Sequence, residues 1–346
     1  MSIKDISNTD KINYLNIGLM LLSVVVAFFV PFELFLFSYA VLGPAHYLTE
    51  ISWLHERNYF SSGKRDYIPL AIAGLIIFLV FLNPQLKLFT PITGSHLNTG
   101  VVCLAFLASL AMVLLKQPFH RLIAFIIIIA ASMLFSSTAS AALFFSVFLP
   151  TLIHVYLFTG FFMLFGALKS KSTSGYISCV IFFLIPLLFI FITPDSFGIS
   201  TFAFEHYQTF QVVNQEIVKL FNVSTDHATT WGDVIYHSKA GTIIMRFIAF
   251  AYTYHYLNWF SKTSVIKWHQ VPKKRLLIIG ILWIASVGFY LYNYRWGFNV
   301  LFLLSFMHVF LEFPLNHVTI IGIFKEIFGR VSGNKPVPAA VKSKRK

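Results

Sequence analysis

The sequence predicts an all-α, polytopic integral membrane protein, built as a bundle of about ten transmembrane helices. The chain has 346 residues, of which 57% are hydrophobic and only 11% are charged, and its mean hydropathy is +0.75. An ordinary soluble domain has roughly 25% charged residues. Several apolar runs approach the roughly 20 residues that cross a bilayer core as a helix, and they are too long for the strands of an outer-membrane barrel.

Each apolar run defines one expected helix, and short segments that often contain Lys or Arg separate the runs. Pro31 marks a tight turn between the first two helices. The expected helices, in chain order, are 14–30, 32–55, 67–83, 99–115, 121–137, 141–168, 175–193, 241–261, 275–292 and 297–324.

The distribution of basic residues predicts that both termini are cytoplasmic. With the N-terminus inside, the cytoplasmic segments contain 21 of the 26 Lys and Arg residues, the outer loops contain four, and Arg246 lies within a helix. Basic residues concentrate on the cytoplasmic side of membrane proteins. Omitting one span would invert every later helix and destroy this bias. We therefore expect a multi-pass protein of the bacterial inner membrane.

The segments outside the helices differ in character. A polar N-terminal segment, 1–13, lacks a cleavable signal pattern, so the first apolar run should remain as a helix. The bundle then covers 14–332. Within it, the longest outer segment, 194–240, is expected to form a loop or cap with a short amphipathic helix at 209–221. The basic tail, 333–346, is typical of disorder.

Charge and cysteine content exclude some functions. The net charge of +13 comes from basic residues beside apolar runs and in the tail, which favours anionic lipid as a partner of the cytoplasmic face, with no nucleic acid partner. Only two cysteines occur, Cys103 and Cys179, both within apolar runs. A disulfide framework or a cysteine-based zinc site is therefore implausible.

A His/Glu motif occurs twice, once in the second expected helix and once in the tenth. Both copies read H-x3-E-x4-H, and ionisable side chains at membrane depth usually face the bundle interior and mark function. On a helix, residues four apart share a face at about 40°, whereas residues nine apart point about 180° away. Pro314 offers a break that would swing the last histidine inward. The motif residues are His46, Glu50 and His55, then His308, Glu312 and His317.

Two further histidines, His154 and His255, lie inside the sixth and eighth expected helices. In the predicted topology these helices run in the same direction as the two motif helices, so His46, His154, His255 and His308 can converge. Imidazole and carboxylate together suit iron, manganese or zinc. We therefore expect a metal site of these four histidines, with Glu50 and Glu312 as further ligands, outer partners or catalytic groups.

Other interpretations of these residues remain open. A single intramembrane histidine is more often a hydrogen-bonding residue between helices. The His/Glu pairs also suit a proton or ion relay in a transporter, and histidines on facing helices suit the axial ligands of a b-type haem. Arg246 is expected to compensate the charge of Glu50 or Glu312.

The set of six residues, His46, Glu50, His154, His255, His308 and Glu312, resembles that of histidine-rich integral-membrane oxygenases with non-haem iron. The tight histidine boxes of membrane desaturases and hydroxylases are absent. The isolated histidines on several helices are similar in style to the Brp/Blh-type carotene-cleaving proteins. This resemblance implies an iron-dependent oxygenase or oxidoreductase that acts on an apolar substrate, a lipid or an isoprenoid-like molecule.

Overall fold

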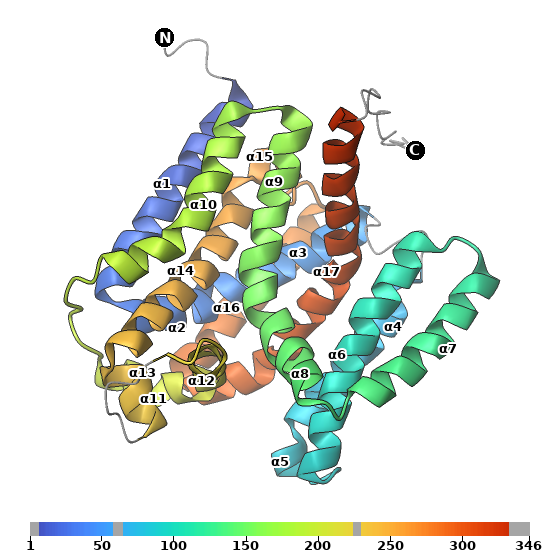
Figure 1. Ribbon diagram of the computed structural model, residues 1–346, viewed down its shortest axis with the longest axis horizontal. Coiled ribbons are helices and arrows are strands. Elements are labelled where there is room, and N and C mark those ends of the chain that lie inside the picture. Colours follow the sequence, from blue (N-terminus) through green and yellow to red (C-terminus); the bar gives the residue numbers. More distant parts are fainter. Residues whose placement is uncertain (1–6, 58–64, 224–229, 332–346) are drawn as a thin grey trace.

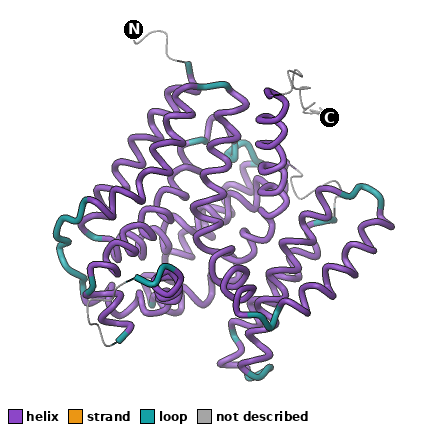
Figure 2. The backbone as a smooth tube through the Cα atoms, viewed as in Figure 1, coloured by secondary structure: helices purple, strands orange, loops and turns teal. Residues whose placement is uncertain are grey.

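The computed structural model describes residues 7–57, 65–223 and 230–331. In this part of the chain every regular element is helical, and no strand is present (Figure 2). The predicted all-α class is confirmed, whereas the predictions for the tail 333–346 and for residues 1–6 fall outside the described residues. The elements, with η marking helices of π or 3-10 geometry, are α1 Asn8–Phe29, α2 Pro31–Phe37, η2 Ser38–Leu42, α3 Gly43–Arg57, α4 Tyr67–Phe81, α5 Asn83–Leu86, α6 Pro91–Leu114, α7 Pro118–Phe135, α8 Ala139–Ala141, η3 Ala142–Phe158, α9 Thr159–Ser170, α10 Thr173–Phe191, α11 Thr201–Tyr207, η4 Gln208–Phe210, α12 Gln211–Leu220, α13 Trp231–His237, α14 Lys239–Ser261, α15 Thr263–Ile266, α16 Lys273–Tyr292 and α17 Tyr294–Val331.

Seven helices of the described chain are long and apolar enough to cross a membrane, and α4 is a shorter apolar helix. The protein therefore has the helices of a membrane protein. Neither α3 nor α14 belongs to the seven, because α3 has 15 residues and α14 carries several polar side chains. The seven are Asn8–Phe29, Pro91–Leu114, Pro118–Phe135, Ala139–Ser170, Thr173–Phe191, Lys273–Tyr292 and Tyr294–Gly329.

The ends of the helices follow from local capping. The side chain of Thr90 accepts a hydrogen bond from the N–H of Thr93, and Pro91 occupies the first turn of α6. This helix therefore begins eight residues before the expected start at residue 99. Residues 91–98 are too polar to be recognised as part of an apolar run, although they extend the helix.

The bundle has two distinct ends (Figure 1). We call the end where α1 begins and α17 finishes the terminal end, and the end where α11, α12 and α13 lie the cap end. The amphipathic helix expected at 209–221 corresponds in position to α12. In Figure 1, α3, η3–α9, α14 and α17 all run from the cap end toward the terminal end.

Helix α14 lies in the middle of the bundle and contacts α1, α2, α3, α10, α12, α13 and η3. Most of its residues are buried. By contrast, α7 buries only Ser132, and α16 buries only Ser286 and Tyr290. The outer faces of α7 and α16 are apolar and exposed, as expected for helices that face lipid.

Candidate metal centre

Four buried imidazoles meet in the interior of the bundle. His46 lies on α3, His154 on η3, His255 on α14 and His308 on α17, and none is more than 6% exposed. The Nε2 atoms of His46 and His255 are 3.1 Å apart. Those of His154 and His308 are also 3.1 Å apart. Four helices that are distant in sequence therefore bring their histidines together in two close pairs, whose rings also contact each other.

The spacing suits a single metal ion. His46, His255 and His308 offer ligand atoms that all lie within 4.8 Å of one another, so these three residues could hold a metal ion. A metal–nitrogen bond of about 2.0–2.1 Å places neighbouring ligand nitrogens roughly 3 to 3.5 Å apart around one ion. Both contacts of 3.1 Å fall within this range, and the second brings His154 to the same cluster.

The hydrogen bonds of Thr159 favour one tautomer of His255. The hydroxyl group of Thr159 donates its one hydrogen to the carbonyl oxygen of Val155, at 2.9 Å. Its oxygen must then accept from the Nδ1–H of His255, at 2.7 Å. A neutral imidazole with its proton on Nδ1 has a lone pair on Nε2, which here faces the cluster. Metal-binding histidines are oriented by this kind of outer hydrogen bond.

The outer sides of the other three rings are less fully paired. Nδ1 of His154 lies 3.4 Å from Oε2 of Glu312, and backbone carbonyls of α17 interact with the ring of His308. Among the described residues, Nδ1 of His46, His154 and His308 makes no hydrogen bond of good geometry. Buried polar groups in purely structural networks are normally satisfied. Of the four rings, His255 alone therefore has a well-formed hydrogen bond at its outer nitrogen among the described residues.

The two carboxylates of the motif contact each other, but they approach different histidines. Oε2 of Glu50 lies 3.0 Å from Nε2 of His46, on the side of the ring that faces the other histidines. Oε2 of Glu312 instead approaches Nδ1 of His154, on the outer side of that ring. Glu50 is thus placed to join the ligands, whereas Glu312 is placed to orient an imidazole. The sequence, in which the two motifs are identical in form, could not separate these positions.

Segments of π geometry precede or contain two of the four histidines. η2 ends just before the turn of α3 that carries His46, and η3 carries His154. Pro150 lies inside η3 and has no N–H to donate, which disrupts regular α-helical hydrogen bonding. Departures of this kind are frequent at functional sites, because they change the direction of side chains. The sequence predicted an uninterrupted helix over 141–168, and Pro150 is its one sign of this irregularity.

Aromatic side chains enclose the cluster. The ring of Tyr47 stacks on His308 with 4.1 Å between the centroids, and its hydroxyl group bonds that of Tyr256 at 2.8 Å. Trp259 lies edge-on to His46 and donates from its indole N–H to Thr49 at 3.0 Å. These contacts lock the rings in place and keep water from the faces of the imidazoles. Tyr47 and Thr159 could not be recognised from the sequence, since both residue types are ordinary in buried helices.

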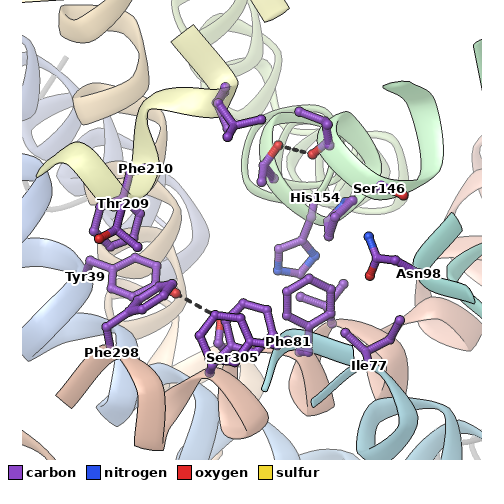
Figure 3. A pocket seen from close by; sticks show the side chains of 18 of the residues that line it. Tyr39, Ile77, Phe81, Asn98, Ser146, His154, Thr209, Phe210, Phe298 and Ser305 are labelled. Atoms are coloured by element: carbon purple, nitrogen blue, oxygen red, sulfur yellow. Dashed lines mark hydrogen bonds between the residues drawn. The ribbon is translucent and has the colours of Figure 1, made fainter. Parts of the chain in front are cut away.

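A cavity of about 630 Å³ lies on the cap side of the cluster, and His154, His255 and His308 form part of its wall. We call it the cap-end cavity. Among its described lining residues there is no Lys, Arg, Asp or Glu, and many are aromatic. Figure 3 shows the imidazole of His154 pointing into this space, with Tyr39 and Phe298 on one wall and Asn98 on another. An apolar molecule in the cap-end cavity would thus reach the histidines directly.

A second cavity, of about 480 Å³, lies on the terminal side of the same cluster, and we call it the terminal-end cavity. His46, Glu50, His255 and Glu312 form its inner wall. Its outer part is more polar and includes residues from the start of α1 and from the ends of α9 and α14. The histidine cluster therefore separates two cavities that approach it from opposite ends of the bundle.

The remaining residues of the two motifs do not join the cluster. His55 is exposed. The ring of His317 contacts the carbonyl oxygen of Phe106 at 2.9 Å, through Nε2. Pro314 does not break α17, which continues to Val331, so it does not swing His317 inward. Both His55 and His317 therefore lie where helical geometry places them, because residues nine apart on a helix point about 180° away from each other.

The expectation for Arg246 was wrong. Its guanidinium donates to the backbone carbonyls of Phe28 and Pro194 and lies over the ring of Phe28, and it makes no ion pair with Glu50 or Glu312. Arg246 precedes His255 by nine residues, which is about 13 Å along the axis of α14. It is therefore too near the cap end to reach either carboxylate, and it instead joins α1 to the segment after α10.

No family model, curated protein or solved structure matches this chain.

Proposed function

We propose that this chain is an integral-membrane metalloenzyme, an oxygenase that acts on an apolar lipid or isoprenoid-like substrate. Its metal ligands would be the Nε2 atoms of His46, His154, His255 and His308. The observation that carries the proposal is the group formed by His46, His255 and His308, with His154 in contact with His308 and Thr159 bonded to the outer nitrogen of His255. The bound metal would supply the binding and activation of oxygen.

The protein side chains have separate roles in this proposal. Glu50 adds a carboxylate beside the imidazole nitrogens, and Glu312 places a second carboxylate beside the ring of His154. Tyr47 and Trp259 exclude water from the rings. The substrate occupies the cap-end cavity, where the lack of charged lining residues among those described favours an apolar molecule.

Non-haem iron is the metal that we favour, because a set of imidazoles and carboxylates without thiolate suits it. Zinc and manganese suit the same donors. Contacts of 3.1 Å between Nε2 atoms favour one ion over a haem, whose two axial nitrogens are separated by about 4 Å with the porphyrin between them.

The proposed setting is the bacterial inner membrane, with ten spans and both termini in the cytoplasm. In this arrangement α3, α4 and α14 would cross the membrane in addition to the seven most apolar helices. The terminal end then faces the cytoplasm, where the basic loops contact anionic lipid. The oxygenase would take its substrate from the same membrane.

Elemental analysis of the detergent-purified protein tests the metal site. We expect about one metal ion per chain, and iron in protein isolated from its native membrane. His46→Ala and His55→Ala form a matched pair on one helix, and only the first removes a ligand. Metal content should fall at least tenfold in His46→Ala and stay unchanged in His55→Ala. A functional preparation without stoichiometric metal, or equal losses in both variants, would refute the site.

A transporter of protons or metal ions is the second candidate, and the two cavities favour it. They reach the cluster from opposite ends, so an ion could enter from one and leave through the other. Against it, the cap-end cavity has a wall better suited to an apolar molecule than to an ion. Flux into proteoliposomes that is lost in His46→Ala and His308→Ala would favour this candidate, and oxygen-dependent substrate turnover would favour the oxygenase.

A further inference from the structure

The polar groups inside the cap-end cavity carry information about its ligand. Most of them are already used within the protein: Tyr39 bonds Ser305, and Tyr47 bonds Tyr256. Ser146 bonds Thr99 at 2.9 Å. The amide of Asn83 is paired at both of its ends with the backbone of Phe89. These groups shape the wall of the cavity and have little capacity left for a ligand.

Asn98 is different. It lies on α6, its side chain is partly buried, and no hydrogen bond joins its amide to any other described residue. Figure 3 shows this amide pointing into the cavity. The other lining groups without such a bond are Ser95 and Thr209, which are exposed at the rim, and the hydroxyl of Tyr252, a buried residue whose ring contacts those of Phe35 and Tyr39.

A carboxamide both donates and accepts hydrogen bonds, so it suits a neutral oxygen group such as an alcohol, aldehyde or ketone. A carboxylate or phosphate would lie in the cavity without a cation to pair with, because no Lys or Arg is among the described lining residues. The position of Asn98 also suits the polar end of a lipid, because neighbouring Ser95 and Pro91 belong to the exposed rim. The apolar remainder would extend inward to the histidines.

The hydrogen bond between Thr99 and Ser146 relates Asn98 to the metal cluster. It holds α6 beside η3 at the residue next to Asn98. From Ser146, η3 continues for eight residues to His154, a distance on the order of 10 Å along the helix. If the ligand oxygen is bound at Asn98, the distance from Asn98 to the histidines determines which carbon of the ligand lies beside them.

We propose that the cap-end cavity binds a neutral lipid with one alcohol or carbonyl oxygen, and that Asn98 binds this oxygen. The inference rests on the proposed function, since it names the class of substrate for that site. It makes Asn98 a specificity-determining residue, which selects both the ligand and the place along its chain that reaches the metal centre.

Binding of three radiolabelled C16 probes to the purified full-length protein tests this inference: hexadecan-1-ol, hexadecane and hexadecanoate. We expect the alcohol to bind about tenfold more tightly than the alkane, as one hydrogen bond in an enclosed site provides. Hexadecanoate should bind more weakly than the alcohol at pH 8. In Asn98→Leu the affinity for the alcohol should fall to that for the alkane, whereas alkane binding and metal content should not change.

Tyr252→Phe is the matched control, because it removes the other buried group of the cavity wall that makes no hydrogen bond among the described residues, and it should keep the preference for the alcohol. Asn98→Ser is measured beside Asn98→Leu, so that a folding defect in one variant is recognised from the other. Equal binding of alcohol and alkane by the wild type, or a preference that survives in both Asn98 variants, would overturn the inference. A preference without stoichiometric metal would overturn the proposed oxygenase and leave the role of Asn98 standing.

Discussion

At the scale of single residues, the centre depends on groups that set the direction of the imidazoles. Thr159 is the clearest example, because its hydroxyl can only accept from His255 once its own hydrogen is donated to Val155. The lone pair of Nε2 in His255 is then directed at the cluster. The outer hydrogen bond therefore prepares the ring for a metal before any metal binds.

Thr159→Val should weaken metal binding about 10- to 100-fold without preventing folding, because it removes the acceptor and leaves Nδ1–H of His255 buried and unpaired. Metal retention against a graded series of chelator concentrations measures the effect. Thr159→Ser should restore wild-type retention. Thr151→Val, on the same helical segment but bonded only to the backbone of Val147, is the control. Equal retention in Thr159→Val and the wild type would contradict the assigned tautomer.

The sequence identified the histidines and glutamates of this site because buried ionisable groups are rare in membrane helices. Thr159 could not be found in the same way. It follows His154 by five residues, which is about 140° on an ideal α-helix, so helical periodicity places it on another face. The π geometry of η3 brings both residues to the cluster, and Pro150 alone does not predict which residues it would bring together.

At the scale of helices, the arrangement depends on close approach as well as on apolar faces. Gly241, the third residue of α14, shows this: an added Cβ would collide with the backbone carbonyl oxygens of Val234 and Ile235 on α13. A backbone contact of this kind cannot be relieved by a rotamer change. Helix α14 carries His255, so the contact between α13 and α14 also helps to position the histidine cluster.

Two Gly→Ala substitutions should therefore have different effects on stability. Gly241→Ala should lower the thermal unfolding midpoint, because relieving the collision costs about 1–3 kcal/mol. Gly288→Ala, on α16, meets no atom within 4 Å, so the free energy of unfolding should stay unchanged or rise by about 0.5–1 kcal/mol at most, and the midpoint should not fall. Scanning fluorimetry of the two purified variants compares them directly. Equal losses in both would mean that the approach of α13 to α14 does not limit stability.

At the scale of the whole molecule, apolar runs predict which segments are helical but not which helices meet. The expected range 99–115 missed the polar first two turns of α6, where Asn98 lies, because hydropathy does not detect them. The two cavities likewise result from packing between helices that are distant in sequence. α3 and α14, which carry His46 and His255, are less apolar than the seven clearest spans, because the polar residues of the site lower their hydropathy.

The orientation of the bundle in the membrane can be tested independently of the fold. Asn222 follows α12 at the cap end, whereas α17 finishes at the opposite end (Figure 1). Because 21 of the 26 basic residues lie in the segments assigned to the inside, a fluorescent protein fused after Lys346 should fluoresce in the cytoplasm. Alkaline phosphatase inserted near Asn222 should be active outside. A reversed result would refute the orientation but keep the fold, whereas reporters on the same side would contradict the arrangement of the helices.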